Sequence, residues 1–287
     1  MKLIVITGLI LFNSAIYADD HLEKGIQQFH ERKLEQAKSF FEDVLDENEQ
    51  DAEAWYWLGR TNLGLRDHDE ALDCFDEAID LDENNAEYHF QRGNALGIKT
   101  QNSMVIKQAW LAPKVLKAFE KAIELDPTHI GGHVGAANFY LQAPGIMGGD
   151  LEKAKEQAKI LLELDEFQGR MLLIAIYQKE DKVDLAEKEF ENFDLAHIDS
   201  TGNYGFYNAS GYFFLRHKKY EKAIAMFKKQ VEMAPDQANP YDSLGDGYKA
   251  AGKYNLAREA YQKALEIDPD FEAPKKNLEE LQKHQKE

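Results

Sequence analysis

Small and aromatic residues recur along this chain with a period of 34 positions, and mostly polar residues fill the spaces between them. The period is visible in sets of identical or similar residues that lie 34 apart: Gly25, Gly59 and Gly93; Ala37 and Ala71; Phe41 and Phe75; Ala223 and Ala257; Phe227 and Tyr261; Pro235 and Pro269. Self-similarity at a fixed spacing of this length indicates a repeat architecture, in which each copy is one supersecondary unit. The pattern therefore predicts a row of copied units instead of one central core.

The residue types at these positions predict that each copy is a pair of helices. Small residues such as Gly59 and Ala71 allow two antiparallel helices to approach closely, whereas Trp55 and Phe75 fill the space between successive pairs. One pair cannot bury its own apolar face, so the pairs must stack on one another.

Two copies carry the pattern most clearly: "WYWLGRTN…EALDCFDEAIDLD" from Trp55 and "YDSLGDGY…LAREAYQKALEIDP" from Tyr241. They resemble the tetratricopeptide repeat. The resemblance implies an all-α, right-handed superhelical solenoid of antiparallel helix pairs over residues 19–270, followed by a polar capping helix over 272–287. The expected repeats are 19–51, 52–85, 86–129, 130–166, a degenerate copy at 167–198, 204–237 and 238–271.

The period is broken twice. Phe75 and Phe119 are 44 apart instead of 34, which places ten added residues near 97–112 of the third repeat. Ala137 and Ala154 are 17 apart, where the matching pair in the second repeat is 12 apart, so five residues are added near 143–150. Both additions are expected to widen the turn between the two helices, and adjacent turns lie on one edge of a stacked array.

The added segments are rich in large apolar residues, of which Trp110, Ile146 and Met147 are the main candidates for contact. Two interpretations stay open: a small satellite core, or an apolar contact surface anchored by Trp110. The run "GGD" at 148–150 does not predict phosphate binding, because Asp150 is expected to cap the next helix and to occupy its free N–H groups.

The chain begins like an exported protein. A positive start at Lys2 and an apolar run over 3–12 precede small residues, which predicts a signal peptide over 1–18 and a periplasmic, otherwise secreted, location. No later run approaches the length of a transmembrane helix. The formal net charge is -18, which disfavours nucleic acid as a partner, and the single cysteine, Cys74, allows no internal disulfide.

No nucleophile, base or metal-ligand constellation stands out, so the sequence predicts no enzyme, no cofactor and no metal site. His89 and His133 occupy the repeat position of Trp55 and are expected to pack between helices. The resemblance implies that first helices line a concave groove that binds peptides. By register, the groove candidates are Tyr56, Arg60, Phe90, Asn94, Val134, Asn138, Asn208 and Tyr212.

The lysine–asparagine set with which some members of the family hold a peptide carboxylate is absent, since Tyr56 and Phe90 stand at the lysine position. The sequence thus predicts a non-catalytic scaffold or adaptor of the cell envelope, which binds a protein or peptide through the groove and through an apolar edge formed by the two inserted turns. The alternatives are a binder of a small or polymeric cell-wall ligand and an accessory subunit of an envelope enzyme. The oligomeric state is not predicted.

Overall fold

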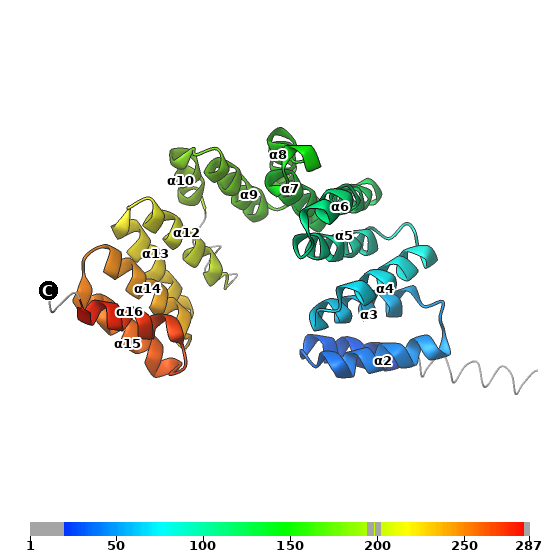
Figure 1. Cartoon of the computed structure of the whole chain (residues 1–287), viewed down its shortest axis with the longest axis horizontal. Coiled ribbons are helices and arrows are strands. Elements are labelled where there is room, and N and C mark those ends of the chain that lie inside the picture. The colour runs from blue at the N-terminus through cyan, green and yellow to red at the C-terminus, as the bar shows by residue number, and fades with distance from the viewer. Residues whose placement is uncertain (1–19, 194–197, 199–201, 284–287) are drawn as a thin grey trace, which may run out of the picture. The chain divides into compact units, whose positions relative to one another are not determined.

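The computed structural model describes residues 20–193, 198 and 202–283, and the expected signal peptide lies outside them. Within the described residues every regular element is helical, which confirms the all-α prediction (Figure 1). A first helix covers residues 20–30. It is followed by α2 (Leu34–Glu47), α3 (Ala52–Leu65), α4 (His68–Leu81), α5 (Ala86–Gln101), α6 (Val105–Leu125), α7 (Ile130–Gln142), η1 (Gly145–Met147), α8 (Leu151–Leu164), α9 (Glu166–Lys179), α10 (Val183–Glu191), α12 (Tyr204–Arg216), α13 (Tyr220–Met233), α14 (Ala238–Ala250), α15 (Tyr254–Ile267) and α16 (Glu272–Lys283).

The chain divides into two compact units, one ending at Glu189 and the other beginning at Phe190. We call them the N-terminal unit and the C-terminal unit. In each, consecutive helices pack against one another along the chain, as α5 does on α6 and α14 on α15. The last helix, α16, packs on α15 and buries Leu281 there.

Close contact between the two helices of a pair depends on the repeated glycine. A Cβ atom added at Gly59 would lie 2.7 Å from the ring of Phe75, and one at Gly245 would lie 2.4 Å from the ring of Tyr261. Both rings are fully buried. The aromatic ring of the second helix therefore fills the space that a side chain at the glycine would occupy, as the 34-residue pattern predicts.

A second contact recurs at the start of four repeats. The Trp55 indole N–H donates to the carbonyl of the residue six positions earlier, at 2.9 Å, and the Tyr241 hydroxyl does the same at 3.1 Å. A ring nitrogen of His89 and one of His133 meet the equivalent carbonyl oxygens, both at 2.9 Å. These histidines thus serve the packing role that the sequence predicts for them.

The insertion in the third repeat differs from the expected widened turn. Most of the inserted residues are helical and lengthen the two helices of the pair. Helix α5 extends to Gln101, α6 begins at Val105, and three residues separate them. Helix α6 runs through Pro113, although a proline removes one backbone hydrogen bond. Leu111 and Val115, on either side of Pro113, are buried against α5, and this packing keeps the segment helical.

The insertion in the fourth repeat forms the short η1 helix. It ends at Gly148, whose φ of 100° lies in the left-handed region that glycine tolerates best. Asp150 then caps α8, since its carboxylate accepts the N–H groups of Glu152 at 3.0 Å and Lys153 at 3.2 Å. This confirms the predicted cap and leaves no free anion site at that terminus.

Candidate functional site

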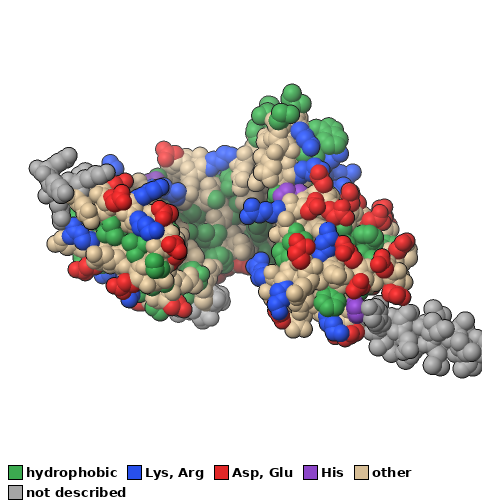
Figure 2. Space-filling view, turned by 60° about the horizontal axis from the view of Figure 1, so that its bottom comes forward, with side chains coloured by type: hydrophobic (Ala, Val, Ile, Leu, Met, Phe, Trp, Pro, Cys, Tyr) green, Lys and Arg blue, Asp and Glu red, His purple; other side chains and the backbone are tan. Residues whose placement is uncertain are grey.

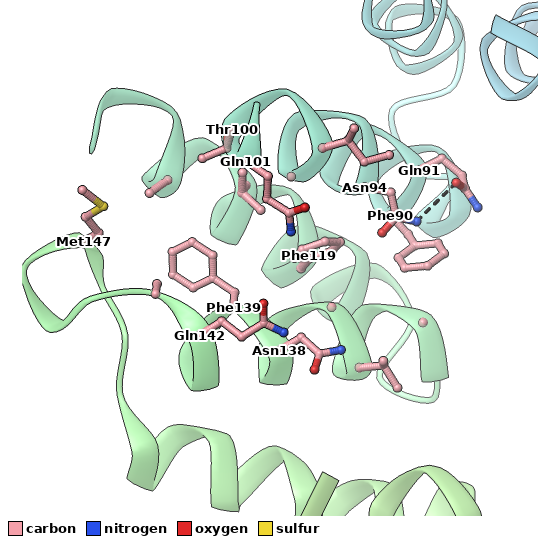
Figure 3. A pocket seen from close by; sticks show the side chains of 18 of the residues that line it. Phe90, Gln91, Asn94, Thr100, Gln101, Phe119, Asn138, Phe139, Gln142 and Met147 are labelled. Atoms are coloured by element: carbon pink, nitrogen blue, oxygen red, sulfur yellow. Dashed lines mark hydrogen bonds between the residues drawn. The ribbon is translucent and has the colours of Figure 1, made fainter. Parts of the chain in front are cut away.

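A groove of about 890 Å³ lies in the N-terminal unit between the extended α5 and α7 (Figure 3). The end of α7, the η1 insertion and the start of α6 line one end of it. Its lining includes Phe90, Asn94, Val134, Asn138 and Met147, all of which the sequence named as contact candidates. Four of these five come from the first helices of their repeats, and Met147 comes from η1.

Three phenylalanine side chains, Phe90, Phe119 and Phe139, form much of the apolar lining. Two glycines of α7 make room for the first two rings. A Cβ atom at Gly131 would lie 2.7 Å from the ring of Phe90, and one at Gly135 would lie 2.6 Å from the ring of Phe119. The glycine-rich start of α7 therefore allows aromatic rings to reach the groove where side chains would otherwise close it.

Amide side chains lie above this apolar lining. Asn94, Gln101, Asn138 and Gln142 are directed toward the groove in Figure 3, from α5 on one side and α7 on the other. The side chains of Gln101, Asn138 and Gln142 make no hydrogen bond to any other residue that the structure describes. Their donors and acceptors are therefore available to a ligand.

The groove is uncharged. Of the described residues that line it, none is an aspartate, glutamate, lysine, arginine or histidine, although charged residues make up 30% of the chain. A charged ligand group placed there would lose water without gaining an opposite charge. A neutral ligand, in contrast, finds an apolar surface together with amide donors and acceptors, which is the combination that a peptide backbone requires.

The relative position of α5 and α7 is set by a network around Glu87. The Gly132 N–H donates to Nδ1 of His129 at 2.9 Å, so Nδ1 is an acceptor and Nε2 carries the proton. Nε2 lies 3.1 Å from the Glu87 carboxylate, which also accepts the Tyr56 hydroxyl at 3.1 Å. Burial and the charge of Glu87 raise the pKa of Tyr56, so this hydroxyl stays a donor. The network fixes the start of α7 against α5.

Tyr56 and Arg60 do not line this groove. Tyr56 is buried and packs on Tyr88, with 5.2 Å between ring centroids, so it belongs to the contact between repeats. The Arg60 guanidinium lies 4.6 Å from the ring centroid of Trp57 and 4.9 Å from that of Phe29. Both side chains are thus engaged in packing within the first repeats.

Trp110 and Ile146 also lie outside the groove lining. Their side chains are 62% and 96% exposed, and Met104 and Ile106 are similarly exposed at the start of α6. A satellite core would bury these residues, so their exposure contradicts that interpretation. Met147 of η1 lines the groove, and so does Gln108 of α6.

The remaining candidates, Asn208 and Tyr212, lie in the C-terminal unit. The Tyr212 hydroxyl donates to Asp246 at 2.9 Å, and the Ser243 hydroxyl donates to Asn208 at 3.0 Å. Beside them, Asp242 is buried, and burial together with the charge of Asp246 raises its pKa to about 6. Asn208 and Tyr212 are thus hydrogen-bonded within the C-terminal unit.

The sequence interpretation missed Gln101 and Gln142, the amides that complete the groove. Gln101 lies seven residues after Asn94 and therefore on the same helix face, but the sequence predicted a turn near 97–112 and no helix there. Gln142 follows Asn138 by one helical turn. Continuing the groove face of α5 by seven positions would have found the first of them.

The described part of the chain contains no group of three or more histidine, cysteine, aspartate or glutamate side chains that could hold a metal ion. Among the same residues, no helix has the length and apolar character needed to cross a membrane.

Comparisons with known proteins agree with the geometry. Three tetratricopeptide repeat models match residues 28–90, 204–237 and 238–271. Superkiller complex protein 3 of Homo sapiens is 24% identical over 269 residues, which is 92% of this chain but 16% of that protein. DnaJ homolog subfamily C member 7 of Mus musculus is 26% identical over 270 residues, which is 78% of this chain and 54% of that protein. The chain therefore spans only part of the length of these relatives.

The fold is shared with a solved tetratricopeptide repeat protein from Parabacteroides merdae ATCC 43184. The TM-score is 0.62 at 16% sequence identity, and the match covers 93% of this chain and 99% of that one. The Cut9–Hcn1 hetero-tetramer of APC/C gives a TM-score of 0.56 at 16% identity, over 87% of this chain and 45% of the matched one. Together with the repeat models and the glycine–aromatic packing of each pair, these matches show that the chain is a tetratricopeptide repeat protein.

Proposed function

We propose that this protein is a non-catalytic scaffold that binds an extended, uncharged segment of a partner protein in the α5–α7 groove. Tetratricopeptide repeat proteins bind protein partners. The observation that carries the specific proposal is the lining of the groove, which combines phenylalanine rings with free amide side chains and contains no charged residue. An asparagine or glutamine side chain can accept and donate to the backbone of a bound strand in the same plane.

The rest of the proposal follows the sequence. The apolar edge formed by the two insertions is a second contact surface, and the signal peptide expected from the sequence supports a location in the cell envelope. The alternative of a polymeric cell-wall ligand relied on Trp110 together with groove aromatics. Because Trp110 lies outside the groove lining, the structure gives this alternative less support than a peptide receives.

The proposal is tested by selection with the full chain from a phage-displayed peptide library. All peptides have the same length, and every position is randomised over all residue types. Peptides selected by the native protein should be depleted of aspartate, glutamate, lysine and arginine at their central positions. Fluorescence anisotropy of a selected peptide then gives the affinity. Selection of charged peptides at the frequency of the starting library would overturn the proposal.

Substitutions locate the binding site. Gln142→Glu introduces a charge at an exposed position of the groove lining. It is expected to weaken peptide binding about tenfold or more, because a bound peptide would cover a carboxylate that has no partner. Gln178→Glu is the matched control, since Gln178 is an exposed amide on α9 outside the groove lining. Equal effects of both substitutions would show that the peptide binds elsewhere.

A further inference from the structure

The exposed hydrophobic residues of this protein are concentrated at one place. Five side chains there are 62 to 96% exposed, whereas every other large hydrophobic residue in the described chain is at most 49% exposed. We call these five the apolar edge: Met104, Val105, Ile106, Trp110 and Ile146. Met104 directly precedes α6, and Val105, Ile106 and Trp110 lie in its first two turns. Ile146 lies on η1, which contacts α6. A concentration of this kind marks a surface that something covers.

The apolar edge projects from the protein. Ile106 is 89% exposed and Ile146 is 96% exposed, so their side chains touch almost nothing. Figure 2 shows hydrophobic side chains gathered at a protruding end of the surface, with basic side chains next to them. A protein partner would need a separate pocket for each projecting side chain, whereas a fluid bilayer adapts to them. The shape therefore favours a lipid surface.

The charges around the apolar edge are unlike those of the rest of the chain. Between Tyr88 and Phe119 the sequence has no acidic residue and five basic ones, although the whole chain has a net charge of -18. The basic residues are Arg92, Lys99, Lys107, Lys114 and Lys117.

Two of these basic residues are neutralised by the neighbouring helix α4. Arg92 pairs with Asp76, and Lys99 pairs with Asp69 at 2.5 Å. Asp73 of α4 also faces this region. Lys107, Lys114 and Lys117 form no ion pair with any residue that the structure describes. The hydrogen bond and charge of Lys99, and then the charge of Lys107, lower the pKa of the paired Asp69, and Glu120 lies one helical turn after Lys117.

The free lysines lie next to the exposed apolar side chains. The Lys114 ammonium is 3.4 Å from the ring centroid of Trp110, and Lys107 directly follows Ile106. Tryptophan prefers the boundary between water and lipid, and lysine side chains reach from apolar surroundings to the charged headgroups. Juxtaposed apolar and basic side chains of this kind bind anionic bilayers without crossing them.

We infer that the apolar edge docks the protein on the surface of a bilayer that contains anionic lipid. The contact is separate from the groove, so the inference stands independently of peptide binding.

The test uses the full chain and vesicles of phosphatidylcholine, alone or mixed with phosphatidylglycerol. The protein should float with the mixed vesicles and bind those of phosphatidylcholine alone more weakly. Brominated lipid should quench its tryptophan fluorescence, and Trp110→Phe should remove most of that quenching, since Trp55 and Trp57 lie outside the apolar edge. Ile106→Ser combined with Ile146→Ser should reduce binding about tenfold or more, since each side chain would otherwise leave water on docking. Leu185→Ser combined with Leu256→Ser is the control for loss of apolar surface outside the apolar edge, since both leucines are 42% exposed.

Lys107→Gln combined with Lys114→Gln should reduce binding to the mixed vesicles and leave binding to phosphatidylcholine nearly unchanged. Circular dichroism and groove binding of a selected peptide check that each variant is folded. Absence of vesicle binding by the native chain would overturn the inference, as would equal binding by the Ile106→Ser, Ile146→Ser variant. Self-association that this variant abolishes, without vesicle binding, would instead assign the edge to a second copy of the chain.

Discussion

Asp242 offers a direct test of the electrostatics in the C-terminal unit. Its side chain is 6% exposed, its Oδ1 atom has no hydrogen-bond partner in the described structure, and Asp246 lies one helical turn away. Burial first, and then the charge of Asp246, raise its pKa from 3.8 to about 6. The carboxyl group therefore binds a proton more tightly in the folded chain than in the unfolded chain.

The sign and size of the effect follow from this difference. The group's contribution to the free energy of unfolding is fully present below pH 4 and is lost as the pH rises through about 6. One pKa unit corresponds to about 1.4 kcal/mol, so the loss at neutral pH is about 3 kcal/mol. Asp242→Asn removes the charge that causes this loss.

Asp242→Asn is accordingly expected to stabilise the protein by about 1 to 3 kcal/mol at pH 8 and to have little effect at pH 4. Urea unfolding followed by circular dichroism at both pH values measures the difference. Asp246→Asn is the matched control. Asp246 accepts hydrogen bonds from Tyr212 at 2.9 Å and Tyr261 at 2.8 Å, so its neutralisation should destabilise the protein. If Asp242→Asn destabilised the protein equally at both pH values, the carboxylate would be paired and the reasoning would be refuted.

Two further predictions concern packing and thiol chemistry. Gly59→Ala should lower the free energy of unfolding by about 1 to 3 kcal/mol, because its Cβ would lie 2.7 Å from the Phe75 ring. Gly145→Ala, where nothing lies within 4 Å, should leave the midpoint of urea unfolding nearly unchanged. Cys74 should react with a thiol reagent only after unfolding, because it is 1% exposed and burial raises its pKa to about 12. Rapid modification of the native protein at pH 8 would contradict this.

The helical repeats could be predicted from the sequence because their determinants are local and recur. Gly59 and Phe75 are 16 residues apart and meet within one pair, and the same combination returns at Gly245 and Tyr261. Likewise, the role of His133 followed from its alignment with Trp55. Each of these inferences needs only the spacing and the size of a side chain.

The candidate site could be predicted only in part. Phe90, Asn94, Val134 and Asn138 were found by register, because one groove face repeats with the helices. Tyr56 was misplaced, since its burial depends on Tyr88 of the next repeat and on the hydrogen bond to Glu87. Register shows which face a residue occupies but does not show whether a neighbouring repeat covers it.

The sequence by itself determined the helical class, the repeat positions, the glycine–aromatic packing and the two places where the period breaks. Only the tertiary structure decided which conformation the residues added at these two places adopt. Packing of Leu111 and Val115 on α5 keeps α6 helical through Pro113, which extends the groove to Gln101 and leaves Ile106 projecting. The reason is energetic, because burial of these two side chains outweighs the hydrogen bond that a proline removes, and a local sequence pattern cannot show that burial.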